Sequence, residues 1–205
     1  GQVAIATPPS GIPGLLAWNT GHYPGPGTPG PTALAHDHVT GPVIYSVTPP
    51  VGGPHSPVWM NAGVYSKPVP TERAVHDMEH GAVWITYSPS LPAAQVVTLT
   101  ALVAKQSLIP ENVQGMPQGQ ANRYIVMSPW ASDSLPAPIV ISSWGYQLRV
   151  SDPVDPRLQT FIDTFREKKN YSPEYGSPVD GVPTGTGGIP ASNGSTVPNP
   201  DGTVG

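Results

Sequence analysis

The pattern of apolar and polar positions predicts four β-strands in the middle of the chain. The clearest is Ala82 to Tyr87, a β-branched and aromatic run that is typical of a strand buried on its interior side. Three further segments have the same character, residues 43–47, 123–127 and 139–150. The pattern predicts the strands but not their order in a sheet.

Helical spacing of apolar residues predicts helices beside these strands. A short helix opens at Pro70 to Arg73 and ends at Gly81, since glycine suits the position with positive φ just past a helix. A second helix is predicted over residues 90–106, where apolar positions recur at intervals of three and four.

The third predicted helix covers residues 156–169. Asp155 suits its N-cap and Pro156 its first turn. The apolar stripe that follows has the spacing i, i+3, i+4, i+7 and consists of Leu158, Phe161, Ile162 and Phe165. The cations among residues 166–169 suit the negative end of a helix dipole. The pattern as a whole predicts one α+β domain over residues 36–172, with an antiparallel sheet and two main helices packed on one face.

Proline and glycine set the character of both ends of the chain. The 29 Pro and 23 Gly make up about a quarter of the 205 residues, so long segments cannot be helix or central strand. Residues 1–35 are predicted to form an extended N-terminal arm. Residues 173–205 form a low-complexity tail, which we expect to be ordered only where a neighbouring subunit holds it.

The arm contains one apolar, β-capable segment, Gln2 to Ala6, ahead of a Pro/Gly linker. Such a segment could add a strand to the open sheet edge of another subunit. Head-to-tail exchange of this kind builds a filament when it does not close into a ring. The alternative is that the arm folds back onto its own sheet and leaves a monomer.

Composition excludes several classes of protein. A net charge of −4 provides no basic surface for nucleic acid, and no apolar run approaches the roughly 20 residues of a membrane span. The absence of cysteine excludes disulfides, thiolate metal sites and a cysteine nucleophile. Low charge and abundant Thr, Ser, Pro and Gly favour an exported, extracellular or cell-surface protein. A chain that begins with Gly1 fits a processed end, although cloning could also produce it.

Five of the six histidines lie between residues 36 and 80, and only His22 lies apart, where we take it as a surface residue. His76 and His80 are four residues apart, so a helical turn would place both imidazoles on one face with Glu79 beside them. Two protonated imidazoles on one face repel, whereas a metal ion between two neutral rings is stabilising. The cluster therefore predicts a metal site.

The segment His76 to His80 also fits His-x-x-Glu-His, the inverted signature of zinc proteases. That chemistry needs a long helix with two histidine ligands, a glutamate base, and a third, carboxylate ligand from a later helix. Here the helix is short, and the later helix 156–169 uses its face for core packing. A zinc hydrolase therefore remains the alternative to a binding protein.

Several blocks in residues 38–87 occur in a fixed order. They are His38-Val39, Tyr45, the loop Pro49-Pro50-Val51-Gly52-Gly53-Pro54-His55, Gly63-Val64-Tyr65, and Val75 to Gly81 leading into a strand. Together they resemble the bacterial and archaeal domain-of-unknown-function family DUF3105. Weaker blocks extend the resemblance over roughly residues 36–175, namely Ser143-Trp144-Gly145, Phe161-Ile162 and Pro173-Glu174. The family label implies no activity.

The resemblance implies that His38, His55, His76 and His80 belong to one motif set, and that members are mostly secreted or membrane-anchored. An all-imidazole set suits copper or zinc, and thioethers favour Cu(I). The less favoured ligands are His36, Met60 and Met78; a helical turn would direct Met78 away from the histidine face and into the core.

Two classes of function follow from this cluster. The preferred one is a copper-binding protein that assembles with itself through its arms, with no catalytic residue assigned. The alternative is a metal-dependent enzyme, either a zinc hydrolase or a copper oxidase. In an enzyme Glu79 would be the acid/base group; otherwise it orients a ligand histidine. We expect the other carboxylates Glu72, Asp77 and Glu111 to be solvated.

Overall fold

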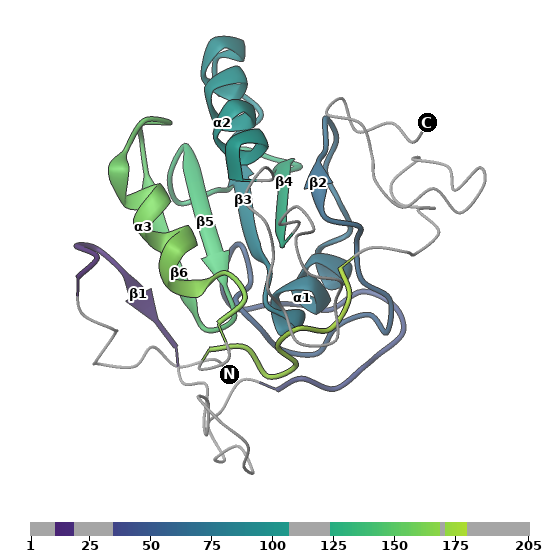
Figure 1. Ribbon diagram of the computed structural model, residues 1–205. Helices are drawn as coiled ribbons and strands as arrows, with labels where there is room; N and C mark the ends of the chain where they lie inside the picture. Colours follow the sequence, from purple (N-terminus) through teal and green to yellow (C-terminus); the bar gives the residue numbers. More distant parts are fainter. Residues whose placement is uncertain (1–10, 19–34, 107–123, 169–170, 180–205) are drawn as a thin grey trace.

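The computed structural model describes residues 11–18, 35–106, 124–168 and 171–179. Within them lie three helices and one six-stranded sheet, which together confirm a single α+β domain (Figure 1). The helices are α1 (Thr71–His80), α2 (Ala93–Gln106) and α3 (Pro156–Phe165). The strands are β1 (Leu16–Ala17), β2 (Gly63–Val64), β3 (Val83–Tyr87), β4 (Ile125–Pro129), β5 (Ile139–Ser143) and β6 (Tyr146–Val150).

The sheet is mixed, with the strand order β1-β6-β5-β3-β4-β2. The pairs β1–β6, β5–β6 and β3–β5 are antiparallel, as expected for the whole sheet, whereas β3–β4 and β2–β4 are parallel. The chain leaves β3, passes through α2 and enters β4 in the same direction. A crossover of this length is what a parallel pair requires.

Two of the predicted strands differ in the structure. Residues 43–47 form no strand: Ile44 is 99% exposed, and the Val43 N–H donates to Glu72 Oε1 at 3.1 Å instead of to a neighbouring strand. The segment 139–150 is an antiparallel hairpin of β5 and β6, not one strand. Gly145 has a φ of +82°, which reverses the chain between the two strands.

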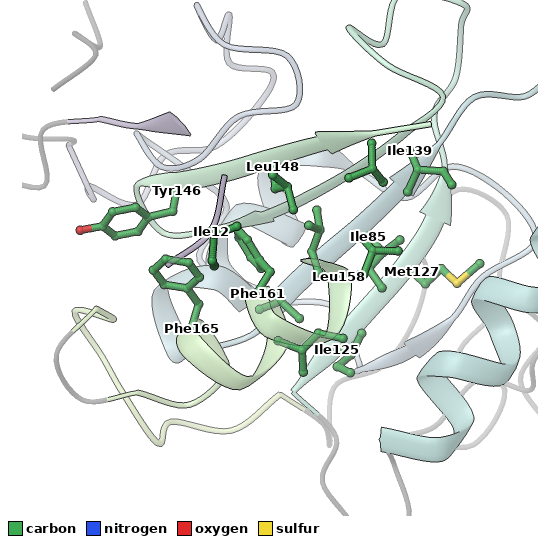
Figure 2. Packing of buried hydrophobic residues seen from close by; sticks show 14 of the residues in the cluster. Ile12, Ile85, Ile125, Met127, Ile139, Tyr146, Leu148, Leu158, Phe161 and Phe165 are labelled. Atoms are coloured by element: carbon green, nitrogen blue, oxygen red, sulfur yellow. The ribbon is translucent and has the colours of Figure 1, made fainter. Parts of the chain in front are cut away.

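Each central strand sends alternate side chains to two cores on opposite faces of the sheet. Val83, Ile85 and Tyr87 of β3 pack with residues of α2 and α3, whereas Trp84 packs with residues of α1. The first core is shown in Figure 2, where Phe161 and Phe165 of α3 face the sheet. The two main helices therefore cover one face, as predicted, and α1 covers the other.

The ends of the helices differ in how well the sequence predicts them. Gly81 follows α1 with a φ of +113°, as predicted, and its N–H donates to Met78 O at 3.1 Å. At the other end of the chain, α3 stops at Phe165, four residues earlier than predicted, because Arg166 is extended. The Glu167 N–H donates to Gly81 O at 2.8 Å, so the chain after α3 is tied to the end of α1.

Parts of both predicted arms pack on the domain. Ile12 and Leu15 are buried in the core with α3, and β1 pairs with β6 of the same chain. Near the C-terminus, the Ala62 N–H donates to the carbonyl of buried Val179 at 2.7 Å. The packed part thus extends beyond residues 36–172 on both sides, while the segment Gln2 to Ala6 and residues 180–205 lie outside the described residues. Among the helices described, none is long and apolar enough to cross a membrane.

Candidate metal centre

The last two turns of α1 carry the centre of the histidine cluster. The inner face of the helix is fixed to the sheet, because Val75 and Met78 pack in one core with Trp84. His76, Glu79 and His80 are also buried, with exposed fractions of 1–3%. Gly81 ends the helix there, and β3 begins two residues later. The helix turn and its cap therefore hold these three side chains on a rigid base.

The two methionines belong to the same core. Met60 and Met78 are fully buried among apolar residues that include Trp84. For Met78 this is the core position that helical geometry predicted. For Met60, which the sequence left open, the structure also supports a packing role.

Three of the histidines are anchored in the same way. The Nδ1 atoms of His55, His76 and His80 lie 2.8, 2.7 and 2.6 Å from the backbone oxygens of Gly53, Ser56 and Pro178. A carbonyl oxygen can only accept a hydrogen bond, so each Nδ1 must carry the proton. In the neutral ring this leaves Nε2 unprotonated, with a lone pair, which is the arrangement of a metal-binding imidazole.

The ring nitrogens of these histidines lie close together. His76 Nε2 lies 2.8 Å from His80 Nε2. The ring centroids of His38, His55 and His76 are 4.9–5.0 Å apart in every pair, and each ring offers a nitrogen within 4.8 Å of the others. The structure thus brings the four predicted histidines into one cluster, with His76 at its centre.

His55 and His38 reach this cluster from loops. The Gly-Gly step before His55 includes Gly53 at a φ of +112°, a conformation that favours glycine. The His55 N–H donates to Asp37 O at 3.0 Å, and the Val39 N–H donates to His55 O at 2.8 Å. This short backbone pairing places His38 beside His55, although the His38 side chain remains 46% exposed.

Two carboxylates complete the cluster. Glu79 Oε2 lies 3.4 Å from His55 Nε2, and Glu79 Oε1 lies 3.8 Å from His38 Nε2. His36 Nδ1 also lies 3.8 Å from Glu79. Glu174 Oε2 lies 3.1 Å from His80 Nε2. Glu79 was predicted beside the histidines, whereas Glu174 was not predicted to belong to the site.

One feature of the sequence could have identified Glu174 as part of the site, namely its place in the Pro173-Glu174 block described above. This segment is held against the end of α1, where the Glu174 N–H donates to Glu79 O at 2.9 Å and the Gly176 N–H to His80 O at 3.2 Å. Those carbonyls are the ones that a helix end leaves without an intrahelical partner. Capping the helix therefore brings Glu174 to the histidine cluster.

Asp77 differs from its prediction. We expected it to be solvated, but it is fully buried on α1 and its Oδ1 accepts from the Met60 N–H at 2.6 Å. Burial raises its pKa well above the usual range, against the opposing effects of that hydrogen bond and of Arg73. Asp77 thus ties the loop at Met60 to the helix, on the side away from solvent. Glu72 accepts from Val43, and Glu111 lies outside the described residues.

Burial decides the charge of the central histidines. It lowers the pKa of His76 to about 4, despite the hydrogen bond to Ser56, and it also lowers the pKa of His80. Burial acts in the same direction on His55, but Glu79 and the bond to Gly53 outweigh it and raise that pKa. The pKa of Glu79 is raised, chiefly by burial. At neutral pH, His76 and His80 are therefore neutral rings with free lone pairs.

The His76 shift predicts a pH dependence of the metal-free protein. The unfolded chain binds a proton on this residue as the pH falls through 6.5, whereas the folded chain binds it only near pH 4. Protons therefore favour the unfolded state within this window. We expect the free energy of unfolding of the wild type, relative to that of His76→Gln, to fall by up to about 1.4 kcal/mol per pH unit between pH 6.5 and 4. Urea titrations of both proteins in the presence of chelator measure this difference in stability. A difference that does not change with pH would contradict the lowered pKa of His76.

One comparison with known proteins places the chain. A family model described as "Protein of unknown function (DUF3105)" matches residues 36–181. The chain belongs to the DUF3105 family. This family match includes all five clustered histidines, Glu79 and Glu174, so the whole centre lies within the DUF3105 domain. No curated protein and no solved structure matches the chain.

Proposed function

We propose that this DUF3105 domain binds a first-row transition-metal ion at the end of α1. The ligands are the Nε2 atoms of the buried histidines together with His38 and the neighbouring carboxylates. The observation that carries the proposal is the 2.8 Å separation of His76 Nε2 and His80 Nε2. Both rings donate through Nδ1 to carbonyls, so neither neutral ring has a proton to share at this contact.

A cation bound by both nitrogens would offset the repulsion between their two lone pairs. Imidazole nitrogens bind zinc at about 2.0–2.1 Å, so two of them on one ion lie roughly 2.9 Å apart at a right angle and roughly 3.4 Å apart in a tetrahedron. The observed 2.8 Å is just below this range, so a small outward shift of the rings admits the ion. Protonation is the other way to bridge two nitrogens, but burial opposes it by lowering the pKa of both histidines.

Copper is our first choice of metal, and zinc is the alternative. Among divalent first-row ions, Cu²⁺ binds a given nitrogen and oxygen set most tightly. The structure adds Glu79 and Glu174 to the histidines and places both methionines in the core. These oxygen donors favour Cu²⁺ or Zn²⁺ over Cu⁺, which prefers soft sulfur ligands.

Elemental analysis of the purified protein, followed by thermal unfolding with and without chelator, tests the proposal. At a free Cu²⁺ concentration 100 times Kd, binding to the folded state alone adds about 2.7 kcal/mol. For a domain of this size we expect Tm to rise by roughly 5–10 °C. An equal Tm with and without chelator at neutral pH would count decisively against a structural site.

Trp59 provides a second readout of the same titration. Its ring centroid lies 5.6 Å from that of His76 and 5.3 Å from that of His80. Paramagnetic Cu²⁺ at these histidines should quench Trp59 fluorescence, and Zn²⁺ should not. Trp59→Phe, with four tryptophans left elsewhere in the chain, is the control that assigns the quenched signal.

The zinc hydrolase is the second candidate, because one observation favours it. His76, Glu79, His80 and Glu174 each offer a ligand atom, all within 4.8 Å of one another. Glu174 thus provides the later carboxylate that the His-x-x-Glu-His signature requires, although it lies in a turn and not in a helix. In this role Glu79 is the general base. To test for hydrolase activity, the zinc-loaded wild type and the zinc-loaded Glu79→Gln variant are assayed on chromogenic esters and peptides. Equal hydrolysis rates of the two proteins would reject the hydrolase.

Self-assembly through the arms is a separate proposal that rests on the composition of residues 1–35. Export from the cell is another, and it rests on the low charge and the abundant Thr, Ser, Pro and Gly of the whole chain. In the described residues, β1 covers the β6 edge of its own sheet, so a donated strand must compete with β1 or pair elsewhere. We expect deletion of residues 1–8 to leave a folded, metal-loaded monomer, because it removes the β-capable segment Gln2 to Ala6. Light scattering of both proteins measures this change. Continued polymerisation of the truncated chain would end the donor-strand idea.

A further inference from the structure

The cluster holds more ligands than one ion uses. His38, His55, His76, His80, Glu79 and Glu174 all offer a nitrogen or oxygen, whereas a site of this type for zinc or copper uses four or five. These donors form two sets that share His76. His76 can serve only one ion, because its Nδ1 is committed to the Ser56 carbonyl.

Distances divide the donors into an inner and an outer set. The inner set is His76, His80 and Glu174, in which His80 Nε2 lies 2.8 Å from His76 Nε2 and 3.1 Å from Glu174 Oε2. The outer set is His38 and His55, whose Nε2 atoms lie 3.8 and 3.4 Å from the Glu79 carboxylate. The inner set offers three ligands and the outer set two, and each leaves coordination positions for Glu79 or water.

Glu79 lies between the two sets. Its oxygens are near His38 and His55 of the outer set, and it also offers an oxygen within 4.8 Å of the ligand atoms of the inner set. Both oxygens are buried, and neither has a partner with good hydrogen-bond geometry among the described residues; His55 Nε2 lies 3.4 Å from Oε2. A buried carboxylate in such surroundings is costly unless a proton or cations neutralise it, and a bridge between two ions uses both oxygens.

We propose that the centre binds two divalent cations per chain, bridged by Glu79. The inner ion is held by His76, His80 and Glu174, and the outer ion by His38 and His55. Two ions on one carboxylate lie about 3.5–4 Å apart, as in other two-metal sites. This inference rests on the proposed function, since a chain that binds no metal cannot bind two ions.

Each set combines buried and exposed ligands. In the inner set the two histidines are 3% exposed, whereas the Glu174 side chain is 47% exposed. In the outer set His55 is fully buried, whereas the His38 side chain is 46% exposed. Each ion therefore has one solvent-facing ligand, through which a chelator can reach it.

Isothermal titration with CuSO₄ or ZnSO₄, followed by elemental analysis after gel filtration, measures the stoichiometry. We expect two ions per chain in the wild type, and one in His38→Ala, whose partly exposed side chain makes misfolding a small risk. His55→Ala should also bind one ion. His22→Ala, which changes the one histidine outside residues 36–80 of the sequence, is the matched control and should still bind two.

Electron paramagnetic resonance of the Cu²⁺-loaded protein tests the bridge itself. Two Cu²⁺ ions on Glu79 should couple, so that the integrated signal is below the bound copper and a half-field signal is present. His38→Ala should restore the full signal of one isolated ion, and Glu79→Gln should remove the coupling. Circular dichroism and thermal unfolding of each variant verify that it is folded.

The outcomes separate this inference from the proposed function. One ion per wild-type chain would overturn the pair and leave the metal-binding proposal intact. No bound ion would overturn both. Two uncoupled ions with His38→Ala unchanged would mean that the second ion binds elsewhere, which also overturns the pair.

Discussion

Replacing His80 by alanine is expected to lower the affinity for Cu²⁺ or Zn²⁺ at least about 100-fold. Loss of a group that only orients a ligand costs 10–100-fold, and His80 is itself placed as a ligand. Its Nε2 has the two shortest contacts in the cluster, to His76 and to Glu174. The change therefore removes the donor that the inner set depends on most. Competition with a chromophoric chelator measures the affinity.

The control for His80→Ala must remove a buried hydrogen-bonding side chain elsewhere. Gln106 is 1% exposed at the end of α2 and exchanges hydrogen bonds with Gln159, on the other side of the sheet from α1. Gln106→Ala should lower stability modestly and leave the metal affinity unchanged. Equal affinities of wild type and His80→Ala, with both proteins folded, would contradict the placement of the metal at this residue.

The largest loss of stability is expected for Phe161→Ala, at about 3–5 kcal/mol. Phe161 is fully buried in the core between α3 and the sheet, and its ring lies 4.6 Å from that of Phe165 (Figure 2). The change removes a large apolar surface and leaves a cavity that the rigid sheet can fill only in part. Urea unfolding of the metal-free protein measures the difference. Val97→Ala, at a 67% exposed position of α2, should change stability by less than about 0.5 kcal/mol.

A matched change on the opposite face separates stability from metal binding. Trp84 is 1% exposed, packs in one core with Val75 and Met78 of α1, and donates from Nε1 to Ser128 Oγ at 3.0 Å. Trp84→Ala should cost as much stability as Phe161→Ala, but it should also weaken metal binding, because it removes the base on which α1 rests. If Phe161→Ala weakened metal binding equally under conditions where both variants are folded, the two faces would not be independent.

The centre of the site could be predicted from residues that are close together in the sequence. The spacing of His76 and His80 places both rings on one face of any helical turn, and Gly81 ends that turn where a positive φ is needed. Likewise, Asp155 caps α3 by accepting from the Arg157 N–H at 2.9 Å, as its position before Pro156 predicted. These features depend on residues within one or two turns of each other, so a sequence pattern is enough to predict them.

The β-strand predictions were less complete for a physical reason. Residues 43–47 have the composition of a strand, but a strand also needs a partner with free backbone groups, and here Val43 bonds to the Glu72 carboxylate instead. The parallel pairing of β3 with β4 also depends on the path of the chain through α2. Neither property is present in the residues of one strand.

Contacts between distant segments determine which ring nitrogen each histidine leaves unprotonated. The carbonyls that hold His76 and His80 belong to Ser56 and Pro178, 20 and 98 residues away. Glu174 reaches the cluster because its segment caps the carbonyl ends of α1, and Asp77 is buried because the loop at Met60 closes over it. The residue types that are able to bind a metal can be recognised from the sequence alone. Their tautomers, their pKa values and their grouping around Glu79 arise from contacts between distant segments, and those contacts exist only in the folded chain.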